Sequence, residues 1–272
     1  MKRYVNAPLP KRLGAFILDL FLVIISATFF FSVLSNIFTE TQAFKEANQV
    51  MNDISIESHL FEYQDEKKLV VDVVKEEDYP VAIKMYYEDY VKNTDEYNKK
   101  MTESKLFDYI DGEYIKKETV SEDKVLEFYK TLMGEAIIEV RSNEKYEFCY
   151  QVTYNYLTYS VVLSVLVAFL LFIVLVPVIN KRKCTLGQRV LDITLVNSDT
   201  NEKVTNVQIA FRAIIILIVE IYIGTYSLFL GAIISVLMIM FRKDNRSFHD
   251  IFANVKMIDY HYVKLDDQLH KK

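Results

Sequence analysis

The sequence predicts an all-α transmembrane bundle of about four helices, with a small α+β domain inserted on the extracytoplasmic side. Three observations predict this class. Long apolar runs with almost no charge alternate with polar stretches, and basic residues flank those runs. One polar stretch, residues 38–154, holds 27 acidic and 15 basic residues in a chain whose net charge is only −5. Because Lys and Arg collect on the cytoplasmic side of a membrane, the acidic stretch is expected outside the cytoplasm.

Four regions follow from this pattern. We expect a cytoplasmic lead-in and first transmembrane helix at 1–38, an acidic extracytoplasmic α+β insertion at 39–153, the remaining transmembrane region with a cytoplasmic hairpin at 154–258, and a cytoplasmic tail at 259–272. The predicted location is a cell membrane, with both termini in the cytoplasm and residues 40–150 outside it.

The first apolar run, residues 13–38, holds one charged residue, Asp19. About 20 apolar residues are enough for a helix to cross a bilayer. The run exceeds the apolar core of a signal peptide, and no small-residue cleavage pattern closes it. We therefore expect an uncleaved transmembrane helix, and the alternative is a cleaved signal.

Two further apolar tracts follow the insertion. Residues 148–180 contain no charge and predict a second transmembrane helix. Residues 207–241 would be about 52 Å long as one helix, too long for a hydrocarbon core of roughly 30 Å. Because both of its flanks are basic, we expect two short helices with a break near 224–225, or a re-entrant hairpin.

Alternation of apolar and polar residues predicts several strands. VLDITLV (190–196) and VKMIDYHYV (255–263) are expected to pair as a small cytoplasmic sheet. In the insertion, HLFEY and KLVVDVV predict a hairpin, while VAIKMYYEDYVKN and DKVLEFYKTLM have helical spacing.

Charged residues inside the apolar tracts are the candidate functional residues. Asp19 and Arg212 are each about 8–9 Å deep by helical rise, and this matched depth predicts that they pair. Glu220 lies deeper, without an evident counter-charge. The charges are either fasteners between helices or parts of a proton or ion relay.

A second cluster, Arg246, His249 and Asp250, follows the last apolar tract. A histidine next to an aspartate titrates near neutrality or anchors the chain through hydrogen bonds. Anchoring is the commoner role of juxtamembrane polar residues and is the one that we expect.

These motifs together resemble one family. RLGAFILD, TLGQRVLDITLV, FRAI and RSFHDIFANVKMI resemble the RDD family of bacterial membrane proteins. The arginine and two aspartates of that name correspond to Arg12, Asp19 and Asp250. The resemblance covers about 8–38 and 155–258. It implies a multi-pass membrane protein, and some members are associated with sodium–proton exchange.

The chain departs from the family pattern at several positions. Leu186 and Gln188 replace a usual Pro and Lys, and Ala253-Asn254 replaces Gly-Thr. The large acidic insertion is not part of the family core, so its role does not follow from the resemblance.

Two functions remain. One is transport of ions or small solutes such as cations and protons, by a homo-oligomer because four crossings are few for a carrier. The other is a membrane-anchored accessory protein whose insertion recognises an envelope component or partner protein. No catalytic, cofactor or metal motif predicts an enzyme. The bilayer is the expected partner of the basic flanks, and nucleic acid is not.

Overall fold

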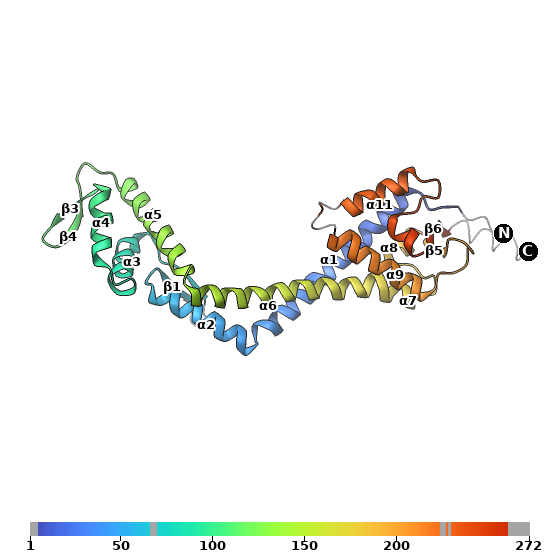
Figure 1. Ribbon diagram of the computed structural model, residues 1–272, viewed down its shortest axis with the longest axis horizontal. Helices are drawn as coiled ribbons and strands as arrows, with labels where there is room; N and C mark the ends of the chain where they lie inside the picture. The colour runs from blue at the N-terminus through green and yellow to red at the C-terminus, as the bar shows by residue number, and fades with distance from the viewer. Residues whose placement is uncertain (1–4, 66–69, 224–226, 228–229, 261–272) are drawn as a thin grey trace, which may run out of the picture. The chain divides into compact units, whose positions relative to one another are not determined.

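A computed structural model describes residues 5–65, 70–223, 227 and 230–260 (Figure 1). The chain divides into two compact units, one formed by Met1–Leu34 with Ser160–Lys272 and the other by Ser35–Tyr159. We call them the RDD-like unit and the acidic unit. The expected helical class is confirmed in its coarser form, since helices predominate and the strands form three small sheets.

Two long apolar helices match the first two predicted crossings. They are α1 (Leu9–Thr39) and α6 (Glu144–Phe169), which continues through the π-helical η3 (Leu170–Leu175) and α7 (Val176–Ile179). Both are long and apolar enough to cross a membrane. Only 6% and 22% of their most apolar windows are buried, so neither is the core helix of a soluble domain. Their exposed apolar faces suit hydrocarbon.

A small sheet forms one end of the RDD-like unit. Strand β5 (Ile193–Asn197) pairs antiparallel with β6 (Val255–Asp259), which confirms the predicted pairing of these segments. Residues 5–7 add to the other side of β6, where the Ala7 N–H donates to the Met257 carbonyl at 3.0 Å. Wholly buried Ile193 and Val255 belong to the core beneath the sheet.

Short helices complete this unit. They are α8 (Leu186–Val190), α9 (Asn206–Ile215) with the π-helical η4 (Ile216–Ile223), α11 (Leu230–Phe241) and α12 (Phe248–Phe252). Thr185 and Thr205 cap α8 and α9, each in a capping box with a glutamine three residues later. Helix α11 packs back against η4 (Figure 1). The predicted break at 224–225 lies outside the described residues.

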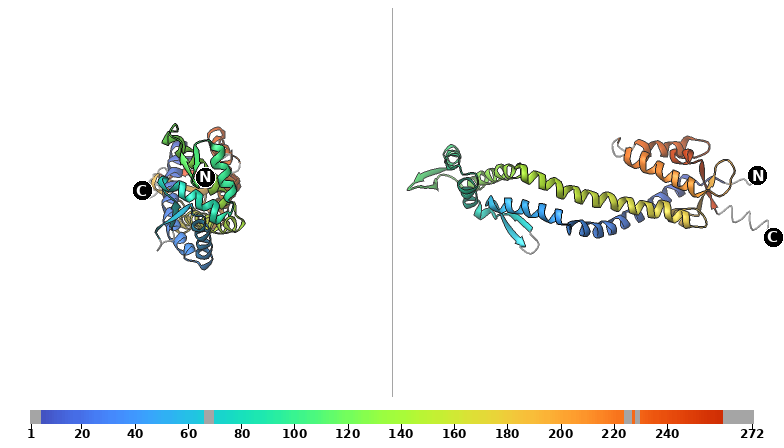
Figure 2. Two further views of the ribbon diagram at one scale, coloured as in Figure 1. Left: turned by 90° about the vertical axis from the view of Figure 1, so that its left-hand side faces the viewer. Right: turned by 60° about the horizontal axis from the view of Figure 1, so that its bottom comes forward.

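The acidic unit is an α+β fold. Its elements within the unit are α2 (Gln42–Glu57), β1 (Phe61–Asp65), β2 (Val70–Val73), η1 (Glu76–Asp78), α3 (Tyr79–Met85), η2 (Tyr86–Tyr90), α4 (Thr94–Ser104), β3 (Phe107–Ile110), β4 (Glu113–Lys116) and α5 (Glu122–Arg141). Figure 2 shows its two antiparallel hairpins, β1–β2 and β3–β4. The first hairpin and the helices α3 and α5 agree with the sequence pattern. Wholly buried Leu60, Ile83, Tyr86 and Met101 belong to its core.

Candidate functional site

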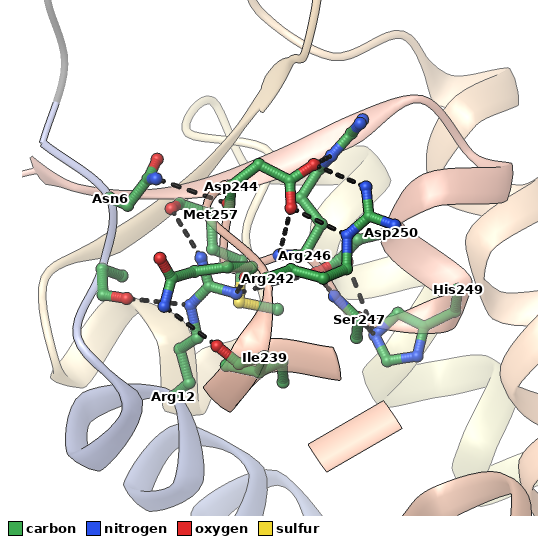
Figure 3. A network of polar contacts seen from close by, with 12 residues as sticks. Asn6, Arg12, Ile239, Arg242, Asp244, Arg246, Ser247, His249, Asp250 and Met257 are labelled. Atoms are coloured by element: carbon green, nitrogen blue, oxygen red, sulfur yellow. Dashed lines mark hydrogen bonds and ion pairs between the residues drawn. The ribbon is translucent and has the colours of Figure 1, made fainter. Parts of the chain in front are cut away.

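Arg12 acts as a clamp in the first turns of α1. Its Nε donates to the Ala7 carbonyl at 2.9 Å and its Nη2 to the Met257 carbonyl at 3.0 Å. Its Nη1 donates to the carbonyl of Asn245 (Figure 3). The side chain is buried, so these three carbonyls replace the water that a guanidinium otherwise binds. One residue thus joins the start of α1, strand β6 and the loop after α11.

Asp250 lies wholly buried between two guanidinium groups. The Nε of Arg212 donates to its Oδ1 at 2.8 Å, and the Nη1 of Arg12 lies 4.0 Å from its Oδ2. The backbone N–H of Ser247 approaches Oδ2 at 3.5 Å. Burial raises the pKa of this carboxyl, but the charge and hydrogen bond of Arg212, together with His249 and Arg12, outweigh it and the pKa is lowered to about 2. Asp250 is therefore a carboxylate at neutral pH.

His249 lies beside this pair. Its Nε2 lies 2.9 Å from the Nη2 of Arg212, 2.9 Å from the Oγ of Ser247 and 3.4 Å from the Oδ1 of Asp250. His249 therefore anchors α12 to α9 through side-chain contacts, in keeping with the expected anchoring role.

Asp19 does not pair with Arg212, and the predicted pair is wrong. Asp19 accepts a hydrogen bond from the Thr185 hydroxyl at 2.5 Å and one from the Gly187 N–H at 2.8 Å. A Cβ on Gly187 would overlap the carbonyl oxygen of Ala15, so glycine is required for α8 to approach α1 this closely. Asp19 thus ties α1 to the start of α8.

The other predicted residues lie elsewhere. Arg246 is separate from the His249–Asp250 contacts, because its Nε donates to Asp244 and its Nη1 to Ser198, both at 2.9 Å. The side chain of Glu220 lies outside the described residues. Sequence reasoning missed Thr185 and Gly187, although the TLGQ motif contains both.

A cavity of about 350 Å³ lies beside these contacts, within the RDD-like unit. Its polar lining consists of Arg12, Asp19, Thr185, Gln188, Arg212 and His249, and the rest of its lining is apolar. Among the described residues, no group of three or more His, Cys, Asp or Glu side chains is arranged to hold a metal ion.

Comparison with known families identifies this arrangement. The model of the RDD family matches residues 128–254. Residues 128–254 are thus an RDD family domain. The matched stretch includes Arg212, Asp250 and Gly187, while Arg12 and Asp19 precede it in sequence and join it in space. Comparisons with curated proteins and with solved structures give no match. Together with the two apolar helices, the family points to a membrane location.

Proposed function

We propose that the chain is a multi-pass membrane protein in which the RDD-like unit is a scaffold and the acidic unit, outside the cytoplasm, binds an envelope component or a partner protein. The observation that supports this proposal is that the two motif carboxylates, Asp19 and Asp250, are held by hydrogen bonds within the protein. Both oxygens of Asp19 and the Oδ1 of Asp250 accept hydrogen bonds from the protein. A carrier needs a carboxylate that can exchange its partner for a cation or proton, whereas bonded carboxylates suit a scaffold.

The proposed topology follows from the basic flanks. Helices α1 and α6–α7 each cross once, and the 206–241 tract enters and leaves the membrane from the cytoplasmic side. Both termini are then cytoplasmic and the acidic unit is outside. Protease added to intact spheroplasts should cleave the acidic unit, and cleavage in inside-out vesicles alone would contradict this topology.

The β3–β4 hairpin is the proposed recognition surface. Ile110 and Ile115 are 48% and 49% exposed and lie on one face of it, because Ile115 pairs with Asp108, two residues before Ile110. Apolar side chains grouped on a soluble surface commonly mark a binding site. The unit as a whole is rich in carboxylates, so this face is an apolar feature that a protein partner would bury.

A photo-crosslinking experiment tests this proposal. A crosslinking amino acid at Ile110 in the full chain, expressed in its native envelope, should give one discrete adduct that Ile115→Ser abolishes. The matched control position is Ile138 of α5, which is 67% exposed. No adduct from Ile110, or equal adducts from both positions, would contradict recognition by the hairpin.

Transport by a homo-oligomer is the second candidate, because Asp19, Arg212 and His249 all line the cavity. Purified protein in proteoliposomes should then show cation or proton flux that Asp19→Asn abolishes without loss of monodispersity. Asp244→Asn is the control, since Asp244 pairs with Arg242 in a partly exposed loop. Such a result would replace the scaffold proposal, and flux that survives Asp19→Asn would exclude Asp19 from a transport path.

A further inference from the structure

Two hydrogen-bond donors of the RDD-like unit belong to side chains that line its cavity. Gln188 accepts the Thr185 N–H through Oε1 at 3.1 Å, which fixes its amide orientation and leaves Nε2 as a donor. Arg212 uses Nε and Nη2 and leaves Nη1. Neither of these nitrogens has a hydrogen-bond acceptor among the described residues. The two residues are only 3% and 7% exposed, and the sealed side-chain atom without a partner in the described part of the chain is Asn201 Oδ1, so the two donors are open to the cavity.

The acceptors at this end of the cavity are already in use. Both oxygens of Asp19 accept bonds, and the Oδ1 of Asp250 accepts from Arg212. The groups that still lack a hydrogen-bond partner at this end of the cavity are therefore donors, and one of them, the guanidinium of Arg212, is charged. An oxygen anion is the ligand group that satisfies such donors best, because charge-assisted bonds to a guanidinium are the stronger ones.

The remaining walls of the cavity are apolar. They include Phe16, Leu20 and Val23 of α1, Ile173 of η3 and Ile216 of η4. Phe16 and Leu20 are 59% and 44% exposed, so the cavity opens on the apolar face that α1 presents to lipid. A volume of about 350 Å³ lies at the lower end of small-molecule sites and suits one chain rather than two.

We propose that this cavity binds a single acyl chain ending in an anionic oxygen head, a carboxylate or a phosphate monoester. The head accepts hydrogen bonds from Arg212 Nη1 and Gln188 Nε2, and the chain lies against α1, η3 and η4. A water-soluble anion would leave the apolar walls unfilled, and a hydrocarbon would leave the two donors unpaired. This binding is independent of the partner proposed for the acidic unit.

Photolabelling of the full chain in phosphatidylcholine nanodiscs tests the site. The probe is a long-chain carboxylic acid with a diazirine on its chain, and the label should map to the cavity walls of α1 and η3. Val23→Trp fills the cavity and should reduce this labelling about tenfold. Ile24→Trp is the matched control, because Ile24 is exposed on the same helix and does not line the cavity. Label spread over all lipid-facing helices and unaffected by Val23→Trp would overturn the proposal.

The head group is tested by competition and by one polar variant. Palmitate should displace the probe and hexadecanol should not, and equal displacement by both would overturn recognition of an anion. Stronger displacement of the probe by lysophosphatidate than by palmitate would indicate that the bound chain belongs to a phospholipid. Stronger displacement by palmitate would indicate a free fatty acid. Gln188→Glu keeps the oxygen that accepts the Thr185 N–H but repels an anion, so it should weaken labelling. Unchanged labelling of a folded Gln188→Glu protein would contradict the assigned contact.

Discussion

Replacement of Asp250 by asparagine tests the central contact of the RDD-like unit. The Asp250 side chain is 0% exposed, and those of Arg12 and Arg212 are 3% and 9% exposed. Asp250→Asn therefore leaves two buried guanidinium groups without their shared counter-charge. Removing one partner of a buried ion pair costs about 3–5 kcal/mol, and we expect a loss of this size in the free energy of unfolding.

The assay is an SDS titration of the purified protein in mixed micelles. Protection of the β5 and β6 amides from hydrogen exchange reports the folded state of the RDD-like unit, whereas tyrosine circular dichroism would report mainly the acidic unit, which holds 14 of the 19 Tyr. Glu202→Gln is the control, since Glu202 is exposed and an exposed substitution changes the free energy of unfolding by at most about 0.5 kcal/mol. Asp250→Asn combined with Arg212→Gln should lose less than the sum of the single losses, by about 2 kcal/mol. If Asp250→Asn is no more destabilising than Glu202→Gln, the buried pair does not hold the unit together.

Four further predictions concern stability. Gly187→Ala should lose about 1–3 kcal/mol in the same titration, because a Cβ would overlap a backbone carbonyl of α1. The pKa of Asp250 is about 2 in the folded state and roughly 3.9 in the unfolded state, so its contribution to the free energy of unfolding is complete above about pH 4 and falls as the pH drops toward 2. Unfolding at several pH values should show this loss of stability, and the Asp250→Asn protein should lack this pH dependence. Met101→Ala should destabilise the acidic unit by about 2–5 kcal/mol, measured by its protease resistance, because Met101 is wholly buried. Arg12→Lys cannot bond three carbonyls in the same planar geometry, so hydrogen exchange at the Ala7 amide should accelerate, whereas an unchanged rate would show that the clamp is dispensable.

The length of the uncharged apolar runs made the long helices predictable. The β5–β6 pairing followed from a weak alternation of apolar and polar residues in both segments, and the two expected strands pair directly. Helix α4 was not predicted, because Tyr97 and Met101 are its only buried residues. The β3–β4 hairpin was missed because its strands have only four residues each.

The partner of Asp19 could not be predicted from its depth. Depth along a helix gives a height in the membrane but not the direction in which a side chain points. Asp19 binds Thr185 and Gly187, from a loop and a five-residue helix too short to produce a periodic pattern. The convergence of Arg12, Arg212 and Asp250 likewise depends on tertiary packing, because these residues are far apart in the chain.

The hydrogen bond from Arg12 to the Met257 carbonyl joins residues 245 positions apart. During translation the arginine leaves the ribosome long before its acceptor on β6, which emerges only after 245 further residues have been added. A nascent or truncated chain therefore carries the Arg12 guanidinium at the start of α1 without its acceptor on β6. Such a group is costly next to hydrocarbon, so incomplete chains are expected to be marked for removal by the cell's membrane proteases.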